Sequence, residues 1–120
     1  MKYLLMIYMN PQIMESLSEA DQQAVFAGHD ELIKLTTQTG ELVRGDALAD
    51  PSQSAVVRVR DGQVAVTDGP YVEAKEFLAG YYMMDCDTRE RAIELAAMIP
   101  DAAFHMIEVR PIMHEGGSEM

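Results

Sequence analysis

Apolar side chains occupy nearly every position at the start of the chain. From residue 2 to residue 9, Tyr, Leu, Ile and Met lie on both of the alternating faces that a β-strand presents. A strand with one buried face would alternate apolar and polar residues instead. The pattern predicts a strand over residues 2–9 that is covered on both sides. Asn10-Pro11 follows without a small-residue cleavage site, which argues against a signal peptide.

The spacing of apolar residues then changes to that of a helix. Ser18 with Asp21 three residues later is a variant of the capping box, with Asp in place of the usual Glu. Apolar or small residues recur every three or four positions from Val25 to Leu35, and Gly40 favours termination. We expect a helix between Ser18 and Gly40.

Residues 55–67 show the clearest local pattern. Valines alternate with arginines or small residues on either side of Asp61-Gly62. Asp-Gly between two alternating segments is a strong hairpin signal, because glycine readily adopts the positive φ that the turn needs. We expect Arg58 and Arg60 to be solvated positions that protect an exposed strand edge.

The remaining segments complete the predicted order of elements. Residues 41–45, 80–85 and 104–112 are predicted strands, and the second of them is apolar on both faces. Asp87 or Thr88 caps a second helix, which Pro100 ends. Residues 1–113 form one domain, and residues 114–120 form a polar tail.

This order predicts an α+β fold, namely a ferredoxin-like βαββαβ arrangement with an inserted β-hairpin. Two helices cover only one face of a four-stranded sheet, yet two of the strands are apolar on both faces. A second copy related by a twofold axis is the simplest cover for the other face. We therefore expect a homodimer with stacked sheets, which forms a dimeric α/β barrel.

Composition narrows the choice of partners. The chain has 120 residues, of which 48% are hydrophobic, and nine basic against twenty acidic residues give a net charge of −11. Such a charge disfavours nucleic acid and anionic membranes as partners. The single cysteine, Cys86, excludes an internal disulfide. No motif for a metal or a cofactor is evident, and we expect a soluble cytoplasmic protein without either.

One long motif resembles a known family. The segment Thr67-Asp68-Gly69-Pro70-Tyr71-Val72-Glu73-Ala74-Lys75-Glu76, followed by Ala79-Gly80-Tyr81, is similar to the signature of the DGPF branch of the YCII-related family. Tyr71 stands where that signature usually has phenylalanine, and Ala79 replaces a glycine. The resemblance extends over residues 1–113.

The resemblance implies a dimeric α/β barrel and a candidate acid–base pair. Carried over by position, the histidine of the pair is His29 and the aspartate is Asp68. Asp46 is a second candidate acid for His29. Members of this branch often occur beside sigma factors of the extracytoplasmic-function type.

The motif adds three candidate ligand-binding residues, Tyr71, Glu73 and Lys75. Lys75 would neutralise an anionic ligand or pair with a carboxylate near His29. Alternatively, these charges lie on a solvated loop or form ion pairs with the other subunit. Asp68 would equally well form an Asx turn, and His29 would be a core histidine bonded to a backbone carbonyl.

Three functions remain open at this level. The first is a cofactor-independent enzyme in which His29 shuttles a proton and Asp68 orients its ring, for elimination, isomerisation or hydration of a small molecule such as an aromatic compound. The second is a non-catalytic ligand-binding or interaction module linked to an extracytoplasmic-function sigma factor. The third is a dimeric scaffold without a ligand.

Overall fold

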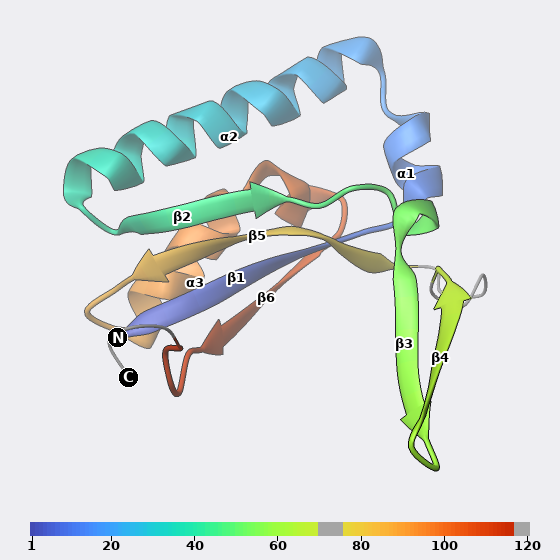
Figure 1. Ribbon diagram of the computed structural model, residues 1–120. Coiled ribbons are helices and arrows are strands. Elements are labelled where there is room, and N and C mark those ends of the chain that lie inside the picture. Colours follow the sequence, from blue (N-terminus) through green and yellow to red (C-terminus); the bar gives the residue numbers. More distant parts are fainter. Residues whose placement is uncertain (70–75, 117–120) are drawn as a thin grey trace.

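The computed structural model describes residues 1–69 and 76–116, and the larger of its sheets has four strands (Figure 1). The strands are β1 (Lys2–Met9), β2 (Leu42–Ala47), β5 (Phe77–Asp85) and β6 (Met106–Pro111). They lie in the order β2-β5-β1-β6, and each neighbouring pair is antiparallel. The predicted α+β class is confirmed.

Two longer helices follow the predicted boundaries. Helix α2 (Glu19–Thr39) begins after Ser18, whose side chain accepts the Asp21 N–H, and ends at Gly40 with a φ of 81°. Helix α3 (Arg89–Met98) is capped by Thr88, which accepts the Arg91 N–H. Local side-chain capping and a left-handed glycine therefore fix these helix ends, as the sequence predicts.

Three short helices were not predicted. Helix α1 (Pro11–Ser16) starts where the Asn10 side chain accepts the Gln12 N–H and Pro11 takes the first position. The 3₁₀ turns are η1 (Pro51–Gln53) and η2 (Pro100–Ala103). Phe104 and His105 form a turn after η2, in which both N–H groups donate to the carbonyl of Asp101, so β6 begins at Met106 rather than at residue 104.

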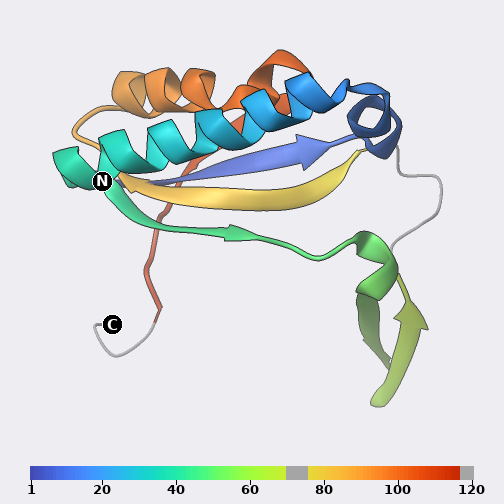
Figure 2. The same ribbon diagram turned by 90° about the horizontal axis from the view of Figure 1, so that it is seen from above.

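Helices α2 and α3 lie on the same face of the sheet (Figure 2). The inward side chains of β1 on this face, Tyr3, Leu5 and Ile7, are each at most 7% exposed. They join one core cluster with residues of α2, β5 and α3, including Leu32, Met84 and Leu95. Burial of these apolar side chains is the main favourable contribution to the stability of the layer.

The opposite face carries the second set of apolar side chains from β1 and β5. Pairing places Leu4 opposite Met83 and Met6 opposite Tyr81, on the side away from the helices. Met6 is only 7% exposed, while Leu4, Tyr81 and Met83 are half-buried. Neither helix of the described part of the chain covers this face (Figure 2), which we call the open face.

The predicted hairpin is confirmed as a separate two-stranded sheet. Strands β3 (Ala55–Arg60) and β4 (Gln63–Asp68) pair antiparallel in the expected register. Asp61 and Gly62 form the turn with φ of 53° and 75°, both in the left-handed region that a type I′ turn requires. The hairpin projects from one end of the larger sheet, on the side of its open face (Figures 1 and 2).

Candidate functional site

A cleft of about 640 Å³ lies between helix α2 and the β2–β5 edge of the sheet. Its walls are mainly apolar, with Ile7, Met14, Val25, Phe26 and Ile33 among the lining residues. His29, Tyr82 and Asp101 contribute polar atoms to the same wall. A largely apolar cleft with a few convergent polar groups is the usual form of a small-molecule site.

The three polar residues form a continuous hydrogen-bonded chain. His29 Nε2 lies 2.5 Å from Asp101 Oδ1, and His29 Nδ1 lies 2.6 Å from the Tyr82 hydroxyl. An ionised carboxylate only accepts hydrogen bonds, so a neutral imidazole carries its proton on Nε2. Nδ1 then accepts the hydrogen bond of the Tyr82 hydroxyl. Both ring nitrogens are therefore held by side chains, which excludes a core histidine bonded only to backbone.

A close approach of two backbone segments positions Asp101 beside His29. Gly28 precedes His29 on α2, and a Cβ atom at this glycine would collide with Cγ of Pro100. Pro100 opens η2 and is followed directly by Asp101. The missing side chain of Gly28 therefore lets η2 contact α2. This role of Gly28 is not apparent from the sequence, because Pro100 lies 72 residues away along the chain.

A second glycine makes room for Tyr82. Gly45 on β2 pairs with Tyr82 on β5, and a Cβ atom at Gly45 would lie 2.7 Å from Cδ1 of the tyrosine ring. The ring thus crosses the face of Gly45 toward α2, where its centroid lies 5.8 Å from that of His29. Two glycines on different elements therefore determine the positions of both partners of the imidazole.

Burial and negative charge keep the Tyr82 hydroxyl protonated. Tyr82 is only 6% exposed, and burial, together with the carboxylates of Asp101 and Asp30, raises its pKa to about 12. Each of these causes disfavours the phenolate. Tyr82 is therefore a hydrogen-bond donor to His29 at neutral pH.

This arrangement is able to move a proton. When His29 takes a proton on Nδ1, the carboxylate of Asp101, whose side chain is 5% exposed, stabilises the imidazolium. This proton comes from the Tyr82 hydroxyl, whose O–H bond breaks as its oxygen takes a proton from a bound ligand, and the new N–H then donates to that oxygen. The imidazole side chain remains 22% exposed at the cleft.

The structure places Asp68 differently from the expectation of an acid beside His29. Asp68 is the last residue of β4, pairs with Ala55 and is exposed on the hairpin. The carboxylate that bonds His29 belongs to Asp101 instead. Asp68 belongs to the inserted hairpin, whose two-stranded sheet is separate from the four-stranded sheet that lines the cleft, and this explains the difference.

Asp46 lines the cleft but is bonded to other groups. Its carboxylate accepts a hydrogen bond of 2.5 Å from the Tyr81 hydroxyl and two from the Arg44 guanidinium, of 2.9 and 3.0 Å. The hydrogen bonds from Arg44 and then from Tyr81 lower the pKa of Asp46. Asp46 therefore belongs to an ion pair on the open face rather than to the hydrogen-bonded series of Asp101, His29 and Tyr82.

The other predicted ligand-binding residues, Tyr71, Glu73 and Lys75, lie outside the described residues. Two residues of the hydrogen-bonded chain were not singled out from the sequence. Tyr82 falls within a strand of apolar residues, and Asp101 follows a proline after a helix. The only signal for Asp101 is an acidic residue in an otherwise apolar stretch after α3, which is weak evidence by itself.

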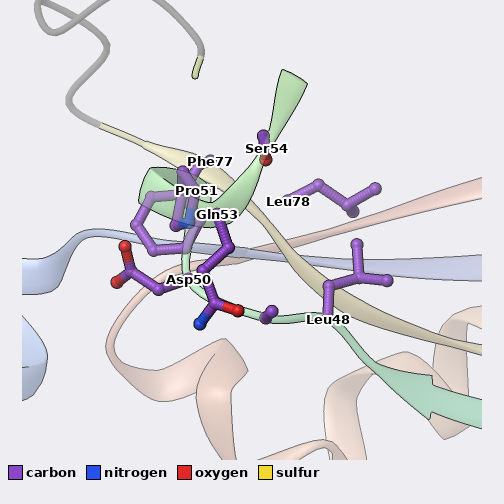
Figure 3. Close-up of a pocket in the computed structure, with 8 residues that line it drawn as sticks. Leu48, Asp50, Pro51, Gln53, Ser54, Phe77 and Leu78 are labelled. Carbon is purple, nitrogen blue, oxygen red and sulfur yellow. The ribbon is translucent and has the colours of Figure 1, made fainter. Parts of the chain in front are cut away.

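Two other cavities lack this combination of groups. The first, about 450 Å³, lies at the base of the hairpin and is lined by Leu48, Phe77 and Leu78 (Figure 3). Among its described lining residues the carboxylate is that of Asp50, which accepts the Ser52 N–H, and this hydrogen bond lowers the pKa of Asp50. The second, about 580 Å³, surrounds the ion pair between Glu41 and Arg91.

Residues 1–69 and 76–116 contain neither a metal-binding cluster nor a membrane-spanning helix. No three His, Cys, Asp or Glu side chains of this part of the chain converge in a way that would hold a metal ion. No helix in it has the length and apolar character needed to span a bilayer.

Comparison with known proteins places the chain in a family. Residues 1–115 match the YCII-related domain. The chain is also 26% identical over 114 residues to an uncharacterised protein of Rhizobium meliloti, an alignment that covers 93% of this chain and 92% of the relative. Since the domain match spans nearly the whole sequence, the chain belongs to the YCII-related family.

Proposed function

We propose that this protein is a cofactor-independent enzyme that catalyses proton transfer on a small molecule bound in the cleft. The observation that supports this most directly is the chain Asp101–His29–Tyr82, with contacts of 2.5 and 2.6 Å at the wall of an apolar cleft. In this proposal His29 is the acid–base group and Asp101 replaces Asp68 as its orienting carboxylate. Tyr82 relays the proton between the ring and the ligand.

The functional groups of the site indicate the class of reaction. A positioned imidazole with a carboxylate and a phenol catalyses proton removal and return, which suits elimination, isomerisation or hydration. In the described part of the chain, the acidic residues that line the cleft are Asp30, Asp46 and Asp101, and no Lys or Arg lines it. Because these are acids on a chain of net charge −11, the preferred ligand is uncharged or cationic, and aromatic or alicyclic.

We also propose that the protein belongs to the DGPF branch of the family, has a ferredoxin-like arrangement of strands and helices, and forms a homodimer. The motif around Asp68-Gly69 and Gly80-Tyr81 supports membership of the DGPF branch. The strand order β2-β5-β1-β6 supports a ferredoxin-like arrangement. The open face has an apolar centre between two edge ion pairs, Arg44–Asp46 on β2 and Glu108–Arg110 on β6. An apolar centre with a polar rim supports a homodimer with stacked sheets.

A simple substrate tests the proton transfer without knowledge of the natural ligand. Cyclohex-3-enone is uncharged and becomes the conjugated cyclohex-2-enone when one proton is removed from carbon and another is returned. We expect the protein to accelerate this isomerisation, followed by ultraviolet absorbance, and His29→Gln to reduce the rate by roughly 100-fold or more. His105→Gln is the matched control, since His105 does not line the cleft.

Two results would count against the enzyme. Equal rates for the wild type and His29→Gln would show that the imidazole does no chemistry on this probe. Saturable binding in the cleft, seen as NMR shifts at Val25 and Phe26 without turnover in either protein, would favour the ligand-binding module instead.

The stacked-sheet dimer has its own test. Met83→Lys places a charge at the centre of the open face, where Met83 pairs with Leu4. We expect sedimentation equilibrium to give a dimer for the wild type at micromolar concentration and a monomer for this variant. A wild-type monomer would contradict the assembly and would leave the cleft chemistry to be judged by its own assay.

A further inference from the structure

The hairpin β3–β4 has an exposed apolar face that its own domain does not cover. Val57 pairs with Val66 and Val59 with Val64, so the four side chains lie on one side of the ribbon. Their exposed fractions are 60%, 60%, 57% and 68% in that order. We call these four residues the valine face, and we infer that it is a docking surface for a second copy of this chain.

The hairpin needs a permanent partner in order to be stable. An isolated two-stranded ribbon is marginally stable in water and needs further strands or a packed layer. The hairpin extends the molecule, whose radius of gyration is 16.5 Å against about 14 Å for a compact domain of this length. We call the hairpin β3–β4 the arm. A partner that packs against the arm must be present wherever the chain folds, and another copy of the chain meets that condition.

The position of the arm connects it to the proposed dimer. The hairpin projects on the side of the open face (Figure 2). Stacked sheets lie about 10 Å apart, whereas strands of six residues reach about 20 Å. A copy stacked on the open face would therefore lie alongside the arm. The inference rests on this stacked assembly, which is part of the proposed function.

The size of the open face indicates that further contacts are needed. Four strands about 4.8 Å apart and roughly six residues long give a footprint of roughly 400 Å². A stable interface takes about 800 Å² from each partner. Projected area is smaller than accessible area, because side chains stand out from the sheet, and the sheet face alone provides only part of this surface, which the valine faces of the two hairpins extend.

Charge also favours a second copy as the occupant. The hairpin contains two basic residues, Arg58 and Arg60, and two acidic residues, Asp61 and Asp68, so its net charge is zero. The rest of the chain therefore carries the whole net charge of −11. Two such chains repel each other through most of their surfaces. A neutral apolar arm is a surface through which they meet without this repulsion.

The test compares two double variants of the hairpin. Val57→Thr with Val66→Thr replaces one cross-strand pair of the valine face with residues of similar shape and strand propensity. Val56→Thr with Ala65→Ser alters the opposite face of the same strands and is the matched control. Sedimentation equilibrium should show a dimer dissociation constant raised roughly 30-fold or more by the first variant, and within about threefold of wild type for the control.

A direct measurement covers the case in which a variant loses the hairpin. A mixed dimer of isotope-labelled and unlabelled wild-type chains should show NOEs between chains from the methyl groups of Val57 and Val66. A wild-type dimer without these NOEs, or with an unchanged constant in the first variant, would overturn the docking role of the arm and leave the stacked sheets standing. A wild-type monomer would overturn the arm and the dimer together, whereas the isomerisation assay with His29→Gln judges the cleft independently.

Discussion

Replacement of Gly28 by alanine should destabilise the protein, although the same change in most helices has the opposite effect. In a helix interior alanine is favoured over glycine by about 0.8–1.0 kcal/mol. Here the added Cβ would collide with Cγ of Pro100, a ring atom that cannot rotate away. Overpacking of this kind costs about 1–3 kcal/mol. The expected net effect of Gly28→Ala is a loss of about 1 kcal/mol in the free energy of unfolding.

The same change should also separate His29 from Asp101. Relief of the collision requires η2 to move away from α2, and Asp101 moves with it because it follows Pro100 directly. The contact of 2.5 Å between His29 Nε2 and Asp101 Oδ1 would lengthen. We expect the isomerase activity on cyclohex-3-enone to fall as well, because the carboxylate of Asp101 would no longer orient the imidazole of His29.

Urea unfolding and a double-mutant cycle would check this reasoning. Pro100→Ala removes the colliding Cγ, so Gly28→Ala should become neutral or stabilising in that background. A coupling free energy of about 1 kcal/mol or more is expected between the two positions. If Gly28→Ala alone raises the urea midpoint by the amount expected from helix propensity, the argument that Gly28 sets the contact between α2 and η2 is wrong.

Three further predictions address the charges and tautomers of the fold. Nitrogen NMR of the neutral imidazole of His29 should show the proton on Nε2, and a proton on Nδ1 would contradict the assigned hydrogen bonds. Because the pKa of Tyr82 is raised from 10 to about 12, the folded state retains the hydroxyl proton up to a higher pH than the unfolded state does. Stability should therefore fall by on the order of 2 kcal/mol between pH 10 and 12, and Tyr82→Phe should flatten this part of the profile in urea unfolding. The hydrogen bond from Arg91 lowers the pKa of Glu41, so the pair contributes stability above pH 4.5 that is lost on acidification; Glu41→Gln should cost about 1 kcal/mol at pH 7 and progressively less as the pH falls below 4.5, measured by thermal unfolding.

Local sequence signals predicted the secondary structure where the interactions are themselves local. Ser18, Gly40 and the Asp61-Gly62 turn act within a few residues of their own positions, and each is found as expected. The two apolar faces of β1 follow from the alternation of side chains along a strand. The placement of both long helices on one face also agrees with the expectation.

The candidate site depended on tertiary contacts that no local pattern encodes. His29 was predicted from the sequence, yet its acid comes from a 3₁₀ turn 72 residues away rather than from Asp68. By its sequence context Tyr82 is one more residue of an apolar strand, and only the tertiary structure places its hydroxyl beside the imidazole.

The sequence by itself therefore determined the two long helices and the strands, because capping, turn geometry and side-chain alternation act over short distances, and the family resemblance pointed to the histidine. Only the tertiary structure decided which groups meet that histidine. The close approach of η2 to α2 at Gly28, and the passage of the Tyr82 ring over Gly45, bring together segments that lie far apart along the chain. Absent side chains at these glycines leave no recognisable pattern, and their effect appears only when the elements pack.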